Sequence, residues 1–137
     1  MLYPRAAAAS VHYLGAEGSD TGWLGLRVAH LSTKTVVLRP RKAAAGTLAV
    51  EVAVGRDERS AAVTLVVVRP EGRTMRRVTL DGDGHGRATV SFGGSVRRVD
   101  VVLTNAGSAY RCWRGTDLAC QGVSLDDNRL FRVRASL

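Results

Sequence analysis

Apolar and polar residues alternate along most of this chain, which is the pattern of β-strands that bury one face. In residues 48–54 (LAVEVAV), large apolar side chains occupy every second position, and the positions between them are small or charged. Residues 87–92 and 131–137 repeat the pattern, with their arginine, threonine and serine side chains expected to face water. Alternation over such short stretches predicts half-buried strands.

Two further segments are apolar on both faces, and we expect them to be central strands. They are residues 63–68 (VTLVVV) and 99–103 (VDVVL). Turn-forming residues such as glycine, proline, asparagine and aspartate separate the strand candidates, and no segment carries a convincing helical stripe. Weaker patterns predict four more strands, at residues 11–14, 24–30, 35–38 and 75–80.

About eight or nine short strands, spaced roughly 8–12 residues apart, predict an all-β fold in which two antiparallel sheets pack as a β-sandwich. The pattern leaves the topology open between an immunoglobulin- or fibronectin-like sandwich and a jelly-roll. The length of 137 residues fits one domain. We therefore expect a single β-sandwich domain over residues 11–137, preceded by a disordered or linker segment at residues 1–10.

The composition sets limits on the core and on the partners. Aromatic residues make up only 5% of the chain, so aliphatic side chains must fill the core. The formal net charge of +8 permits binding to nucleic acid or another anionic surface. Arginines supply most of this charge, but they are scattered singly along the strand candidates, which disfavours a nucleic-acid partner. No apolar stretch approaches the roughly 18 residues needed to span a bilayer, so no membrane span is expected.

The two cysteines, Cys112 and Cys120, lie in one polar, turn-rich segment with seven residues between them. This spacing is too wide for a redox Cys-x-x-Cys pair, and no second pair or histidine completes a zinc site. We predict a disulfide, which would contribute about 2–3 kcal/mol by closing the loop. The alternative is two free thiols in a cytosolic protein. A disulfide predicts an extracellular or cell-envelope location.

The start of the chain fits poorly with export by a standard route. Residues 1–10 (MLYPRAAAAS) have one arginine and a short alanine run, without the apolar core of a recognisable signal peptide. The chain is therefore expected either not to be exported by a standard route or to be the tail of a longer protein.

No combination of residues predicts catalysis. The three histidines, His12, His30 and His85, have no metal-ligand spacing, and no serine elbow, phosphate loop or dinucleotide motif is present. We therefore expect no enzyme activity, no catalytic residue and no cofactor. Asp81 and Asp83 resemble part of a calcium loop, but the carboxylates that would complete it are missing. A glycine-rich hairpin between Leu80 and Arg87 explains the same residues, and we favour it over a metal site.

Three aromatic residues could contact a ligand. Trp23, Tyr110 and Trp113 are able to form a stacking surface for sugar rings or peptides. In sandwich proteins such residues more often fill the core or cover a disulfide, and Trp113 is adjacent to Cys112. An exposed indole beside a groove would favour ligand contact, and buried rings would exclude it.

A set of motifs in the C-terminal half resembles a known family. The motifs are residues 99–106 (VDVVLTNA), 110–113 (YRCW), 120–122 (CQG), 125–128 (LDDN) and the final strand at 131–134. They are similar to the C-terminal β-sandwich of the large secreted MXAN_6640-type metalloproteases of actinobacteria and myxobacteria. The resemblance implies an exported multidomain protein with a zinc peptidase domain upstream. The zinc-binding helix of that family is missing from this chain, so no catalytic residue carries over.

Together these observations favour a non-catalytic accessory module of an extracellular, metalloprotease-like hydrolase. Its role would be stability, surface attachment or substrate approach, and its partner an upstream peptidase domain or a cell-surface polymer. The alternative is a free-standing β-sandwich that binds carbohydrate or another polymer through Trp23, Tyr110 and Trp113.

Overall fold

The computed structural model of the chain describes residues 9–15, 18–29, 31–41, 45–54, 61–93, 95–106 and 129–137. These residues contain nine β-strands and no helix, and hence no helix able to cross a membrane. The strands are β1 (Ala9–Leu14), β2 (Leu24–Val28), β3 (Ser32–Pro40), β4 (Ala45–Val54), β5 (Ala61–Arg69), β6 (Gly72–Val78), β7 (His85–Gly93), β8 (Arg98–Asn105) and β9 (Arg129–Ser136).

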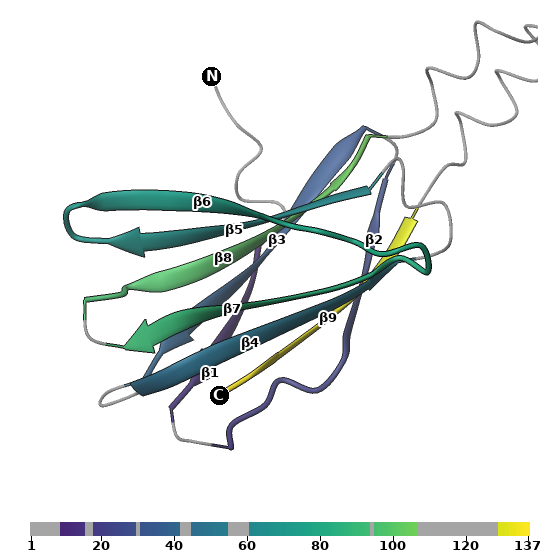
Figure 1. Cartoon of the computed structure of the whole chain (residues 1–137). Helices are drawn as coiled ribbons and strands as arrows, with labels where there is room; N and C mark the ends of the chain where they lie inside the picture. Colours follow the sequence, from purple (N-terminus) through teal and green to yellow (C-terminus); the bar gives the residue numbers. More distant parts are fainter. Residues whose placement is uncertain are drawn as a thin grey trace, which may run out of the picture.

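The strands form two facing sheets, so the predicted β-sandwich is confirmed (Figure 1). The five-stranded sheet has the order β1-β3-β8-β5-β6, and the four-stranded sheet has the order β2-β9-β4-β7. The antiparallel pairs are nested along the chain: β5 with β6, β4 with β7, β3 with β8, and β2 with β9. A long hairpin that folds over on itself in this way has jelly-roll topology. The chain is therefore a jelly-roll and not an immunoglobulin- or fibronectin-like sandwich.

Each of the nine predicted strands overlaps an observed one, and the sheets are antiparallel as predicted except at one strand pair. β1 runs parallel to β3, with Ala9 opposite Thr35 and Leu14 opposite Pro40. A tight turn between consecutive strands would make them antiparallel. β1 and β2 lie in different sheets and are not joined in this way, so β1 can pair with β3 in the parallel direction. β1 begins at Ala9, two residues before the strand that alternation predicts.

Aliphatic side chains at alternate strand positions fill the space between the sheets. In β4, Leu48, Val50 and Val52 are buried, whereas Glu51 is only partly buried on the opposite face. Each fully buried valine or leucine stabilises the fold by about 1.5–3 kcal/mol relative to an exposed one. The largest fully buried side chains are Phe131, Leu38, Leu48, Leu65 and Leu103. The core is therefore aliphatic, as the low aromatic content predicts.

The two strands predicted to be central occupy interior positions of the five-stranded sheet. β8 lies between β3 and β5, and β5 lies between β8 and β6. On β5 even the outward-facing Val66 is only 8% exposed. The neighbouring edge strand β6 differs sharply, because every residue from Gly72 to Arg77 is exposed. One edge of this sheet therefore carries a strand that is solvated on both faces.

A buried asparagine links the two sheets. Asparagine commonly marks a turn, but Asn105 is the last residue of β8 and is fully buried. Its side-chain Nδ2 donates a hydrogen bond of 3.0 Å to the backbone carbonyl of Val28, the last residue of β2. A polar contact inside an aliphatic core fixes the relative placement of these two strand ends, because an unpaired carbonyl there would be costly.

We predict that Asn105→Ala lowers the free energy of unfolding by about 1–3 kcal/mol, because the Val28 carbonyl would stay buried without this donor. Urea denaturation followed by circular dichroism measures the change. Thr104→Ala is the matched control, since Thr104 is only partly buried on the opposite face. It should change stability by less than about 0.5 kcal/mol. Equal destabilisation by both variants would contradict the structural role assigned to Asn105.

Candidate functional site

The segment from Gly18 to Trp23 is fastened along β9. The amide of Gly18 donates to the carbonyl of Leu137 at 2.7 Å, and the amide of Leu137 donates to Ser19 at 2.9 Å. The amide of Thr21 donates to the carbonyl of Ala135 at 2.9 Å. These bonds extend the edge of the four-stranded sheet ahead of β2. They fix the backbone that leads to Trp23 at a defined place beside β9.

An ion pair on the outer face strengthens this attachment. One carboxylate oxygen of Asp20, Oδ2, accepts hydrogen bonds from Nη2 of Arg134 at 2.8 Å and from Nε at 3.0 Å. The other oxygen accepts the amide hydrogen of Gly22. Hydrogen bonding to Arg134, and then to Gly22, lowers the pKa of Asp20 below its ordinary value. The pair is solvent-exposed, so it positions the segment more than it stabilises the fold.

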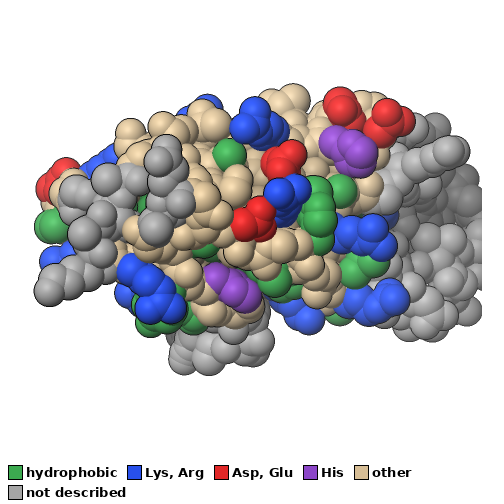
Figure 2. All heavy atoms as spheres, turned by 90° about the horizontal axis from the view of Figure 1, so that it is seen from below, with side chains coloured by type: hydrophobic (Ala, Val, Ile, Leu, Met, Phe, Trp, Pro, Cys, Tyr) green, Lys and Arg blue, Asp and Glu red, His purple; other side chains and the backbone are tan. Residues whose placement is uncertain are grey.

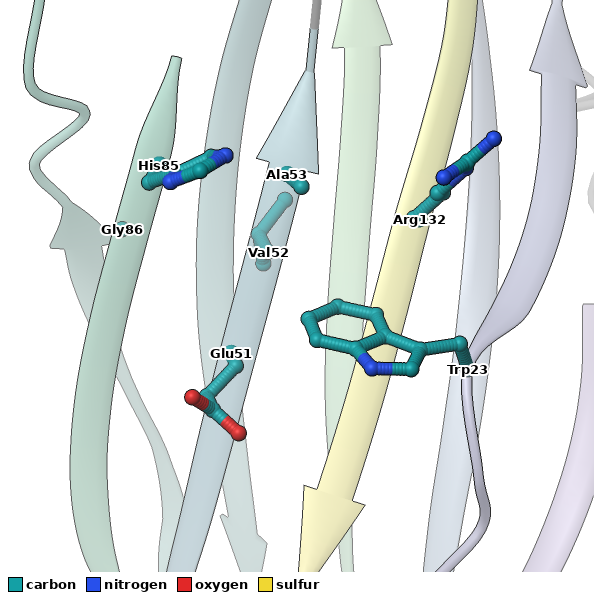
Figure 3. Close-up of a pocket in the computed structure, with 7 residues that line it drawn as sticks. All are labelled: Trp23, Glu51, Val52, Ala53, His85, Gly86 and Arg132. Carbon is teal, nitrogen blue, oxygen red and sulfur yellow. The ribbon is translucent and has the colours of Figure 1, made fainter. Parts of the chain in front are cut away.

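The indole of Trp23 lies over the outer face of the four-stranded sheet (Figure 3). It extends from beside β2 across β9 toward β4, and it is 51% exposed. The ring is therefore not a core residue, and its contact with a ligand stays a prediction. Ala53 of β4 and Gly86 of β7 line the pocket with the indole, and Arg132 of β9 lies opposite Ala53.

Three polar side chains surround this ring. Glu51 from β4, His85 from the start of β7 and Arg132 from β9 line a shallow pocket with the indole (Figure 3). The pocket has a volume of about 340 Å³. Within the described part of the chain, none of the three makes a side-chain hydrogen bond or ion pair. Glu51 interacts electrostatically with Arg134, and His85 with Asp81, but no hydrogen bond to a described residue occupies the side-chain polar atoms of the three. These atoms can therefore bond a ligand.

An aromatic face, a carboxylate, an imidazole and a guanidinium together suit a ring that carries hydroxyl groups. The apolar face of a sugar can stack on the indole, while carboxylate and guanidinium groups bond its hydroxyls in plane. Among the described residues, no group of three or more potential metal ligands is found.

The aspartates of the calcium-like segment have a structural explanation. Oδ1 of Asp81 accepts the amide hydrogens of Asp83 at 2.9 Å and His85 at 3.0 Å. The hydrogen bond from the His85 amide, and then the one from the Asp83 amide, lower the pKa of Asp81 below its ordinary value. A turn forms between β6 and β7, as predicted. The predicted hairpin is wrong, because β6 and β7 belong to different sheets and do not pair with each other. Gly86 permits this crossing, since an added Cβ would lie 2.7 Å from the carbonyl oxygen of Thr79.

The remaining sequence candidates fall outside the described residues. They are Tyr110, Cys112, Trp113 and Cys120, so the disulfide and the contribution of these aromatic rings to a ligand site stay predictions. His30 also lies outside. Of the other histidines, His12 bonds the hydroxyl of Ser10 at 2.7 Å, and His85 joins the Trp23 pocket.

Sequence reasoning missed Glu51, His85 and Arg132 as site residues. Each occupies an outward position of an alternating strand, where a charged residue is ordinary. Only strand pairing brings them together, since Ala53 is opposite both His85 and Arg132. No local motif in the sequence indicates that pairing.

Basic residues are distributed over both outer faces. Register places Arg87, Arg132 and Arg134 on the four-stranded sheet, and Arg39 and Arg77 on the five-stranded one. The face in Figure 2 mixes basic, acidic and hydrophobic side chains. The absence of a large one-signed area on this face argues against a phosphate-backbone interface there.

Comparison with solved structures gives distant likenesses in fold. No family model matches the chain, and no curated protein is detectably similar in sequence. Among solved structures, the pre-peptidase C-terminal domain of collagenase from Bacillus anthracis is similar with a TM-score of 0.49 and 9% identity. The match covers 93% of this chain and 95% of that domain.

A second likeness is to PliG, a periplasmic inhibitor of g-type lysozyme. The Aeromonas hydrophila protein matches with a TM-score of 0.45 and 12% identity, over 94% of this chain and 98% of that one. A mutant of the Escherichia coli protein matches with a TM-score of 0.46 and 12% identity, over 95% and 98%. The resemblance to MXAN_6640-type metalloproteases stays a prediction.

We predict that the carboxyl group of Asp20 titrates below its ordinary pKa of about 3.9, and that Arg134→Ala moves its pKa upward. Because this pKa is lower in the folded chain than in the unfolded one, ionised Asp20 favours folding at neutral pH, and that contribution is lost as the pH falls through the folded pKa. Carbon-detected NMR titration of the carboxyl group measures the shift. Arg132→Ala is the control, and an unchanged pKa in Arg134→Ala would refute the pairing.

Proposed function

We propose that this chain is a non-catalytic accessory module that binds a polysaccharide on the outer face of its four-stranded sheet. The observation that carries the proposal is the half-exposed indole of Trp23, which lines one pocket with Glu51, His85 and Arg132. The exposed indole offers an aromatic face on which a sugar ring can stack, and its N–H can bond a hydroxyl group. The backbone attachment of residues 18–21 to β9 restrains the chain just before Trp23 in the absence of ligand, which lowers the entropy lost on binding.

The polymer would be one found at a cell surface, and the module would bring an associated hydrolase to it. The resemblance to secreted metalloproteases supports a peptidase as that enzyme and an extracellular or cell-envelope location. The predicted Cys112–Cys120 disulfide supports the same location. In this arrangement the peptidase supplies the chemistry, and the sandwich supplies attachment.

The second candidate is a free-standing polysaccharide-binding protein. The same Trp23 site supports it, because binding at this face requires no attached enzyme. The two candidates share the binding step and differ only in whether a catalytic domain accompanies it.

We predict that the protein co-sediments with at least one insoluble polymer among peptidoglycan sacculi, chitin and cellulose, and that Trp23→Ala weakens this binding about tenfold or more. Truncating an aromatic anchor at the centre of a site commonly costs about 2 kcal/mol. The measurement is the depletion of soluble protein over a range of polymer concentrations.

Tyr13→Ala is the matched control for this experiment. Tyr13 is 54% exposed, similar to Trp23, but lies on β1 in the other sheet. It should bind like the wild type. Retention of full affinity by Trp23→Ala, or an equal loss in both variants, would refute the assignment of the site. Failure of the wild type to bind any of the three polymers would refute the proposal for these ligands.

A further inference from the structure

The open side of the sandwich between β6 and β7 has the features of a peptide-binding groove. The two strands diverge from their common turn, so the sheets separate toward the far end of β6 (Figure 1). Residues from β5, β6 and β7 line a groove of about 470 Å³ between them. This groove is separate from the Trp23 pocket, which lies on the outer face of the four-stranded sheet.

Two inward positions of β6 carry polar residues. Thr74 and Arg76 pair with Val67 and Leu65 of β5 and share their inward side, yet both are polar and exposed. Polar residues at inward positions imply water or a polar partner in the space that they face. A partner entering here would contact both sheets.

β7 offers the backbone of an unpaired sheet edge. It pairs with β4 on one side, and no second strand among the described residues pairs with it. The carbonyl of Thr89 points to the free side, because it accepts a hydrogen bond of 2.8 Å from Nη1 of Arg76. The guanidinium thus occupies the place where the N–H of a further strand would lie. Such edges commonly bind extended peptides by strand addition.

The positive charge of the arginines that line the groove favours an acidic partner. Arg69 and Arg76 line it, and Arg69 makes no side-chain hydrogen bond or ion pair with any residue that the structure describes. The nearest acid in sequence, Glu71, lies in the β5–β6 turn and does not line the groove. Apolar contact is available from Val67, Met75 and Val90.

We propose that this groove binds an extended acidic peptide segment of a partner protein, which adds as an antiparallel strand to the free edge of β7. Its outward residue opposite Thr89 exchanges backbone hydrogen bonds with Thr89, while carboxylates at alternate positions point inward to Arg69 and Arg76. Arg76 then moves from the Thr89 carbonyl to a peptide carboxylate. An extended peptide fits better than a nucleic acid, because its amide repeat matches the edge of β7.

The test uses the full chain and a capped octapeptide of four Thr-Glu repeats, with fluorescence anisotropy as the readout. Alternation places all glutamates on one face of the strand. We expect saturable binding, a loss of roughly tenfold or more with a Thr-Lys octapeptide, and about tenfold weaker binding of Thr-Glu to Arg76→Ala. Arg77→Ala is the matched control, since Arg77 is the next residue of β6 and faces the opposite side; it should bind as the wild type does.

Backbone pairing is tested on the peptide, which leaves the protein unchanged. N-methylation of the threonine amides removes the donors that face β7 and should abolish binding, whereas N-methylation of the glutamate amides should not. Equal binding of the two methylated peptides, or equal effects of Arg76→Ala and Arg77→Ala, would overturn the proposal. Tighter binding of a single-stranded dodecanucleotide than of the Thr-Glu peptide would overturn it in favour of a nucleic-acid ligand.

Discussion

The aliphatic layer between the two sheets determines where every outward side chain lies. Leu48, Val50 and Val52 point inward to this layer, so the strand period of two forces Ala49, Glu51 and Ala53 onto the outer face. Slippage of β4 by one residue would bury Glu51 and expose the valines, which makes the register strongly determined. The Trp23 pocket depends on this register, because its floor and its carboxylate both belong to β4. Stability and the candidate binding surface therefore rest on the same constraint.

The strands could be predicted from the sequence because burial of one face is a local property. Adjacent residues show which face of the strand is buried. For example, Val133 is buried and its neighbour Arg132 is exposed, and Phe92 is buried and its neighbour Ser91 is exposed. Topology is not local in this way. β2 pairs with β9, so Leu24 lies opposite Val133 although almost the whole domain separates them in the chain. Only the tight turn between β5 and β6 joins strands that pair directly, and each remaining connection between described strands crosses to the other sheet.

The candidate site also has a part that the local sequence predicts and a part that only strand pairing determines. Trp23 could be proposed from the sequence because a large aromatic residue in a polar, glycine-containing stretch is conspicuous. Its place beside β9 could not, since the backbone before it is held by hydrogen bonds of residues 18–21 to the far end of the chain. Glu51, His85 and Arg132 are unremarkable singly, and they form a site only because β7, β4 and β9 are neighbours in the sheet.

The two binding surfaces inferred for this domain belong to one sheet and need not compete. His85 at the start of β7 lines the Trp23 pocket, whereas Thr89 further along the strand borders the groove. The outward side chains of β7 face the Trp23 side, and its free backbone groups point sideways to the groove. A strand added at that edge would widen the four-stranded sheet without covering Trp23. The domain could thus hold a polymer on its face and a protein segment at its edge at the same time, which is the geometry required of a module that attaches one molecule to another.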